Sequence, residues 1–151
     1  MTEHLPLLVS TAWLADHLDQ ADVVVLDASH HLPGAARDAR ADFAAEHIPG
    51  AQFLDLASLF DATSPVPYAL PQPEQLAERL ASLGVPPGAR IVLYDDSAIR
   101  SAARAWFMLT TSGWAEVAIL DGGLAKWRSE ARPLAGGATD TTATTPAALH
   151  A

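Results

Sequence analysis

The chain has 151 residues, half of them hydrophobic, which suffices for one globular domain with a substantial core. Its formal charge of −9 comes from 18 acidic and 9 basic residues, which argues against nucleic acid or anionic membrane as a main partner. No residue is a cysteine, so a disulfide, a thiolate zinc site and a cysteine nucleophile are all excluded within this sequence.

Short apolar runs alternate with helix-like segments in the first part of the chain. Residues 7–9 predict a strand that stops at Ser10, a favourable N-cap for a helix with apolar residues at helical spacing. The β-branched run 23–26 predicts a central strand, because strands covered on both faces of a parallel sheet are continuously apolar. Residues 38–46 predict a short helix.

The middle of the chain contains a sharp turn and a proline-rich excursion. Pro49 and Gly50 predict a turn that leads into a strand candidate at 53–54. Residues 61–73 contain four prolines, which exclude a long helix or a central strand and predict a surface excursion. A helix is expected from Pro73, closed by Gly84 as its C-terminal cap.

The last third repeats the alternation. We expect a strand at 91–94, a well-buried helix at 101–111, a strand at 117–120 and a short helix at 124–127. This order predicts an α/β domain with a five-stranded, mainly parallel sheet and helices on both faces. After Leu134 the composition shifts to Ala, Gly and Thr, so we assign residues 1–134 to the domain and 135–151 to a flexible linker or tail.

The first residues lack the basic start and apolar core of a secretory signal. No apolar stretch approaches the roughly 20 residues that cross a membrane. A cytoplasmic location is therefore expected, without nucleic acid or membrane as a partner.

Three segments resemble motifs of the rhodanese family, and together the resemblance covers about residues 7–134. The first is His47-Ile48-Pro49-Gly50-Ala51, with Phe43 before it and Leu54 after it. The second is Leu120-Asp121-Gly122-Gly123-Leu124-Ala125-Lys126-Trp127, which is similar to the family's closing segment. The third is Val92-Leu93-Tyr94-Asp95-Asp96-Ser97 with Arg100-Ser101, which lines up with the family's last-but-one strand and active loop.

The resemblance implies a rhodanese-like fold and a role in sulfane sulfur transfer. Members of the family carry the sulfur as a cysteine persulfide at the first position of the active loop, and Asp95 stands at that position here. The chain therefore resembles the amino-terminal, non-catalytic domain of two-domain thiosulfate or 3-mercaptopyruvate sulfurtransferases. That resemblance implies no cofactor, a small sulfur-containing anion as substrate of the complete enzyme, and a cysteine-bearing rhodanese domain as partner, in the same parent chain or as a separate protein.

Besides Asp95, the sequence departs from the family at three further places. The family's usual glycine before the final proline is absent, and Glu130-Ala131-Arg132-Pro133 stands there. Mercaptopyruvate-type members tend to carry an acid and a histidine that face the partner's active site, and Ala57 and Tyr68 occupy those places. An alanine cannot orient a base, and a phenol with a pKa near 10 stays protonated at neutral pH and cannot replace a histidine as proton carrier. These departures leave thiosulfate chemistry or an altered substrate open.

The loop that begins at Asp95 has a functional and a structural interpretation. A strand followed by a tight loop and a helix start is a place where an anion binds, and Asp95 could act as a base or phosphoryl acceptor. We favour the alternative that the Asp95 carboxylate accepts hydrogen bonds from the loop's own N–H groups and so takes the place of a bound anion. Arg100 and Arg104 are candidates to bind an anion, or to pair with nearby carboxylates.

The remaining motif residues are expected to have structural roles. His47, Pro49 and Gly50 should fix a turn, and the pair Gly122 and Gly123 should shape the closing segment. No metal site is expected, because adjacent histidines at positions 30 and 31 direct their rings apart and no cysteine ligand exists. The four tryptophans are expected to pack helices onto the sheet rather than to stack on a ligand: Trp13, Trp106, Trp114 and Trp127.

Two alternative functions stay open beside the non-catalytic sulfurtransferase domain. One is a free-standing inactive rhodanese module that binds or regulates another protein. The other is a phosphoryl acceptor of the response-regulator kind, suggested by adjacent aspartates after a strand, although that class usually places its acidic pair after the first strand. On any of these interpretations the chain alone should not transfer sulfur, because it has no cysteine.

Overall fold

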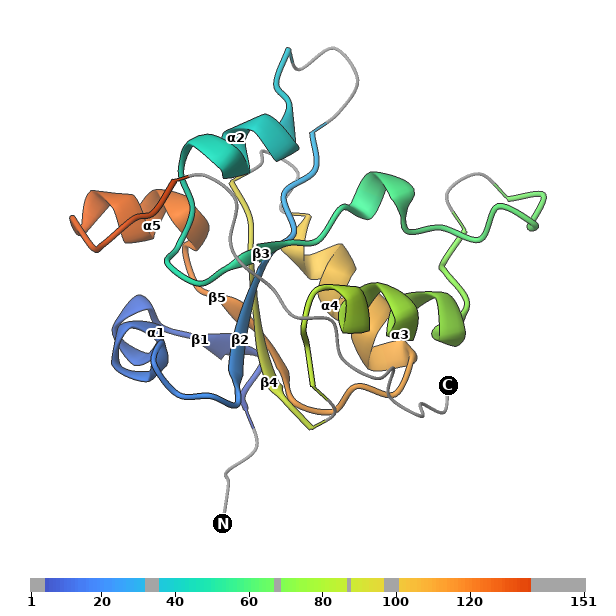
Figure 1. The fold of residues 1–151 in the computed structure, drawn as a ribbon, viewed down its shortest axis with the longest axis horizontal. Coiled ribbons are helices and arrows are strands. Elements are labelled where there is room, and N and C mark those ends of the chain that lie inside the picture. Colours follow the sequence, from blue (N-terminus) through green and yellow to red (C-terminus); the bar gives the residue numbers. More distant parts are fainter. Residues whose placement is uncertain (1–4, 32–35, 67–68, 87, 97–100, 137–151) are drawn as a thin grey trace.

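A single five-stranded sheet organises the molecule (Figure 1). The computed structural model describes residues 5–31, 36–66, 69–86, 88–96 and 101–136. All strand pairs are parallel, in the order β1-β5-β4-β2-β3. The strands are β1 (Leu8–Val9), β2 (Val23–Asp27), β3 (Gln52–Phe53), β4 (Arg90–Tyr94) and β5 (Val117–Leu120). The predicted five-stranded α/β fold is confirmed, but the middle strand is β4, and β2 lies between β4 and β3.

Helices cover both faces of the sheet and bury a separate hydrophobic cluster on each. The helices are α1 (Thr11–His17), α2 (Ala39–Ala45), α3 (Pro73–Ser82), α4 (Ala102–Thr111) and α5 (Gly123–Ser129), with a short 3-10 turn η1 (Leu56–Ser58). Helices α1, α2 and α5 pack with Val25 and Val92 on one face. Helices α3 and α4 pack with Leu26 and Leu93 on the other. Successive strand residues alternate between the two clusters, as a sheet buried on both faces requires.

Capping hydrogen bonds mark the ends of several helices. The Ser10 Oγ accepts a hydrogen bond from the Trp13 N–H at 3.0 Å, and Asp38 accepts two from the start of α2. After α3, Gly84 has φ +80° and its N–H donates to the carbonyl of Ala81 at 3.0 Å. Ser10 and Gly84 are the caps that the sequence predicts. Asp38 was expected as the first residue of its helix and is instead the N-cap.

Helix α5 ends in the same motif with a different residue. The Ala131 N–H donates to the Arg128 carbonyl at 3.0 Å, and the Arg132 N–H donates to the Trp127 carbonyl at 3.3 Å. Ala131 has φ +56°, a conformation that its Cβ disfavours. The glycine that the family usually places here is therefore missing at a position whose backbone conformation favours glycine.

The proline-rich excursion and the chain beyond α5 follow the surface. In the described residues between 61 and 72 no helix or strand forms, as predicted. Beyond α5, Ala135 exchanges two backbone hydrogen bonds with His47, at 2.8 and 2.9 Å, so ordered pairing continues one residue past the predicted domain boundary. Among the described residues, no helix is long and apolar enough to cross a membrane.

Candidate functional site

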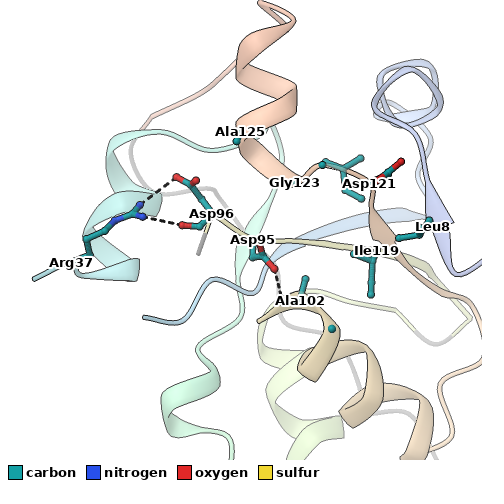
Figure 2. Close-up of a pocket in the computed structure, with 12 residues that line it drawn as sticks. Leu8, Arg37, Asp95, Asp96, Ala102, Ile119, Asp121, Gly123 and Ala125 are labelled. Carbon is teal, nitrogen blue, oxygen red and sulfur yellow. Dashed lines mark hydrogen bonds and ion pairs between the residues drawn. The ribbon is translucent and has the colours of Figure 1, made fainter. Parts of the chain in front are cut away.

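The segment after β4 holds the carboxylate that sequence analysis singled out. Asp95 follows the buried Tyr94 at the carboxyl edge of the sheet, and α4 begins at Ala102. The Asp95 Oδ2 accepts a hydrogen bond from the Ala102 N–H at 2.8 Å (Figure 2). This bond satisfies one of the free amides at the positive end of the helix, with a charged acceptor. The Asp95 carboxylate therefore takes up the Ala102 N–H, which could otherwise donate a hydrogen bond to a bound anion.

The backbone of Asp95 meets the start of α5. The Leu124 N–H donates to the Asp95 carbonyl at 3.1 Å. A Cβ atom on Gly123 would lie 2.6 Å from that carbonyl oxygen, and Gly123 has φ +60°. Only glycine combines this close approach with a left-handed backbone. The second glycine of the predicted closing motif thus joins the segments that follow β4 and β5.

Asp96 is held by contacts from three other parts of the chain. Its N–H donates to the Ser29 Oγ at 2.8 Å. Arg37 donates to the Asp96 carbonyl at 3.1 Å and to the Asp96 Oδ2 at 3.3 Å. The Arg128 guanidinium lies 3.7 Å from the same carboxylate oxygen. These contacts link the loop to the end of β2, to the segment before α2 and to α5.

Further carboxylates surround both arginines. Arg37 also donates to Asp42 at 2.9 Å, and the Arg128 Nε–H donates to Glu46 at 2.6 Å. The hydrogen bond from Arg128 to Glu46 is the main reason that the pKa of Arg128 is raised. A small cleft of about 250 Å³ lies among these groups. Since each arginine already contacts two carboxylates, this cluster is internally paired and does not present a free positive site.

Asp27 and Tyr94 form a buried polar pair beneath this cluster. Asp27 is 3% exposed, and its Oδ1 accepts a hydrogen bond from the Ser29 N–H at 2.9 Å. Burial raises the pKa of the Asp27 carboxyl above its usual range. Burial and the facing Asp27 carboxylate also raise the pKa of the Tyr94 hydroxyl, so the phenol stays protonated and accepts the Ile48 N–H at 3.3 Å. The pair is part of the structural support of the loop.

The comparisons with known proteins assign the family. Residues 10–130 match the model of the rhodanese-like domain. The chain belongs to the rhodanese family. It is 41% identical over 133 residues to a 3-mercaptopyruvate sulfurtransferase of Escherichia coli strain K12, covering 87% of this chain and 47% of that protein. It is 37% identical over 133 residues to a thiosulfate sulfurtransferase of Cricetulus griseus, covering 84% of this chain and 44% of that protein.

A solved structure agrees with this assignment. The crystal structure of SseA from Escherichia coli, a 3-mercaptopyruvate sulfotransferase, superimposes with a TM-score of 0.87 at 38% identity, covering 97% of this chain and 56% of that one. The chain thus spans about half the length of the curated relatives it matches. It is homologous to the amino-terminal region of 3-mercaptopyruvate sulfurtransferases and lacks cysteine.

The rhodanese signature around His47 forms a tight turn. Pro49 and Gly50, with Gly50 at φ +81°, lie inside a turn closed by a 3.0 Å hydrogen bond from the Ala51 N–H to the Ile48 carbonyl. Proline followed by a glycine with positive φ is typical of a type II turn. The buried His47 donates its Nδ1–H to the Phe43 carbonyl at 2.8 Å and stacks on the Phe43 ring. These contacts agree with a structural role for His47.

The structure describes only one of the two arginines that are predicted to bind an anion. Arg104 is exposed on the first turn of α4, and Arg100 lies outside the described residues. Tyr68 also lies outside them, while Ala57 is exposed in η1. Within the described part of the chain, no group of three or more His, Asp or Glu side chains could hold a metal ion.

Sequence reasoning missed Arg37 and Arg128 as the partners of Asp96. Arg37 is 59 residues before Asp96, and Arg128 lies on α5, so no local spacing connects them. Only the parallel sheet, which brings the carboxyl ends of its strands to one edge, places these side chains side by side.

A larger cleft opens on the other side of Asp95. Its volume is about 530 Å³, and it lies between the start of α4, the end of β5 and the start of α5 (Figure 2). Leu8 and Ile119 give it an apolar wall, Asp95 and Asp121 contribute carboxylates, and the ion pair of Arg37 with Asp96 also lines it. A thiol group is absent from this rhodanese domain altogether, so the cleft has no sulfur nucleophile.

Proposed function

We propose that this chain is the non-catalytic amino-terminal rhodanese domain of a two-domain thiosulfate or 3-mercaptopyruvate sulfurtransferase. In that protein a cysteine on the second domain would carry the sulfur, and this domain would pack against it and help to shape the substrate cleft. The single observation that carries the proposal is Asp95, which stands at the nucleophile position with its carboxylate bound to the first amide of α4.

The chemistry of the side chain explains why this domain should be inactive alone. A thiolate attacks the transferable sulfur of the donor and forms an S–S bond as the donor's own bond to that sulfur breaks and the rest of the donor leaves. The acceptor then attacks the outer sulfur, which breaks the S–S bond and releases the thiolate. A carboxylate forms no persulfide, and the Asp95 carboxylate also occupies the Ala102 amide. The half-length match to sulfurtransferases supports a partner domain that supplies the missing thiolate.

The proposal extends to substrate and location. The complete enzyme would act on a small sulfur-containing anion in the cytoplasm, without a cofactor. Ala57 is exposed and offers only a methyl group where mercaptopyruvate-type members tend to carry an acid. Both donors should therefore be assayed, since an alanine cannot orient or hold a proton.

The test is a cyanide-dependent thiocyanate assay with thiosulfate and with 3-mercaptopyruvate. This chain alone should give no turnover above the protein-free rate with either donor. A longer chain from the same reading frame should be active with at least one donor, and substitution of the cysteine in its second domain by serine should abolish that activity. Turnover by this chain alone would contradict the proposal.

A reading frame with no cysteine-bearing domain would favour the alternative of a free-standing binding module. The specific observation in favour of that alternative is the open cleft beside Asp121, which has both apolar and acidic walls. Subcellular fractionation of the native protein tests the proposed cytoplasmic location.

A further inference from the structure

The two faces of the sheet are not equally covered at strand β1. Val9 packs in the cluster beneath α1, α2 and α5. Leu8 points to the opposite face, which α3 and α4 cover, but it belongs to neither cluster and is 50% exposed. In the parallel register Leu8 pairs with Ile119 of β5, which packs against the α3 and α4 cluster. The cover provided by α4 therefore ends at β5 and leaves Leu8 open to solvent.

This uncovered strip is one wall of the 530 Å³ cleft, which we call the β1 groove. Leu8 and Ile119 form the sheet side, and Ala102 and Ala103 of α4 form the opposite side. Figure 2 shows Leu8, Ile119 and Asp121 near one another beyond Asp95. One turn after Ala103 on the same side of α4, Phe107 is 51% exposed and extends the apolar surface.

The acidic end of the β1 groove contains one carboxylate without an internal partner. Asp95 is engaged by the Ala102 N–H. Asp121 is exposed, and its side chain makes no hydrogen bond or ion pair to any residue in the described parts of the chain. Its backbone is fixed, because the Asp121 N–H donates to the Val9 carbonyl at 2.9 Å. The groove thus combines an apolar wall with a fixed and available negative charge.

We propose that the β1 groove binds a segment of a partner protein that presents an apolar side chain next to a lysine or arginine. The apolar side chain would cover Leu8 and Ile119, and the cation would pair with Asp121. This interaction goes beyond sulfur transfer, because it needs neither a thiol nor a second rhodanese domain.

Charge argues against several other occupants. Residues 137–151 contain no lysine or arginine, so this segment does not supply the cation. A second copy carries the same net charge of −9 and would be repelled. Anionic lipid surfaces are disfavoured for the same reason.

The interaction can be tested by NMR on the ¹⁵N-labelled chain with the peptide acetyl-Leu-Arg-Leu-Arg-Leu-amide as probe. We expect saturable shifts of the backbone amides of Leu8, Ile119, Asp121 and Gly122, with weak affinity in the millimolar range. The matched peptide acetyl-Leu-Glu-Leu-Glu-Leu-amide should cause no shift at these amides. Adding salt should weaken binding of the basic peptide, because the pair with Asp121 is at the surface.

Two variants separate the two parts of the groove. Asp121→Asn and Leu8→Ser should each weaken binding by about fivefold or more, since each removes one contact that the proposal requires. Glu78→Gln and Val66→Ser change an exposed charge and an exposed apolar residue outside the groove, and should leave binding unchanged. A ¹H–¹⁵N spectrum with native dispersion checks that each variant is folded.

Three results would overturn the proposal. The first is the absence of shifts at the groove amides with the basic peptide. The second is equal binding by the parent chain and both groove variants. The third is a concentration dependence of the same amides without peptide, which would mean that a second copy occupies the groove. None of these results depends on sulfurtransferase activity, so they leave the proposed function to its own assay.

Discussion

Asp95 and Asp121 follow neighbouring parallel strands at the same edge of the sheet, yet their environments are opposite. The Asp95 carboxylate accepts the Ala102 N–H, its carbonyl accepts the Leu124 N–H, and the next residue is held by Arg37. The Asp121 side chain is exposed and makes no contact of this kind within the described residues. The same residue type therefore stabilises the fold in one position and remains available to a partner in the other.

Position at the carboxyl edge of the sheet does not by itself define a binding site. What matters is whether the chain already supplies the counterpart of each polar group. In the segment after β4, the chain supplies partners for the polar groups of Asp95, and the segment is part of the internal structure. In the segment after β5, the chain supplies no such partner for the Asp121 carboxylate within the described residues, and this carboxylate stays exposed beside the apolar strip at Leu8.

A substitution at Gly123, where the segments that follow β4 and β5 meet, should cause the largest loss of stability. A Gly123→Ala variant would place its Cβ 2.6 Å from the Asp95 carbonyl oxygen in a backbone with φ +60°. We expect the free energy of unfolding to fall by about 2 to 4 kcal/mol, since backbone must move and the conformation is disfavoured. Urea unfolding followed by circular dichroism measures the change.

Gly50→Ala is the matched control for that junction. A Cβ atom on Gly50 would meet no other atom within 4 Å, although the φ of +81° is also unfavourable. A loss of about 1 to 2 kcal/mol is expected, from the backbone conformation alone. Equal losses in the two variants would mean that the contact with Asp95 is not what restricts Gly123.

The side chains of Asp95 and Asp121 should contribute differently to the free energy of unfolding. Asp95→Ala leaves the first amide of α4 without its acceptor and should lower the free energy of unfolding by about 1 to 2 kcal/mol. Asp121→Ala should change it by less than about 0.5 kcal/mol, as surface substitutions without partners do. If Asp121→Ala destabilised the chain as much as Asp95→Ala, the contrast between an internal and an available carboxylate would be wrong.

A substitution at the C-terminal end of α5 should give a smaller change in the free energy of unfolding, and this change should be stabilising. Ala131→Gly should raise the free energy of unfolding by about 1 kcal/mol, because Ala131 has φ +56° in a helix-ending motif that favours glycine. Gly84→Ala, in the same motif after α3, should lower it by a similar amount. A shift in the urea midpoint at unchanged slope is the readout. No gain from Ala131→Gly would show that the left-handed position is not strained.

Local signals in the sequence predicted most of the fold. Ser10 and Gly84 cap their helices as expected, because caps depend on neighbouring residues. The strand near residue 53 is found one residue early, at Gln52–Phe53, and the turn η1 was not predicted. Trp127 is fully buried and Trp114 is 6% exposed, in line with the expected packing onto the sheet.

The candidate site was harder to predict, because its contacts are distant in sequence. Asp95 could be singled out from the strand before it and the family motif around it. Its acceptor role toward Ala102 follows from the approach of a helix start to a strand end. The pairing of Asp96 with Arg37 and Arg128 depends on strand order and register, which no local pattern encodes. The exposure of Leu8 likewise depends on how far α4 reaches across the sheet.

The bond between the Asp95 carboxylate and the Ala102 amide also bears on competition with ions in solution. Because the carboxylate is tethered to the same chain as the amide, it acts as a ligand at a high effective concentration that dilution does not lower. A free anion at millimolar concentration must displace this ligand and also approach a protein of charge −9. The Ala102 amide is therefore insensitive to changes in the surrounding pool of small anions.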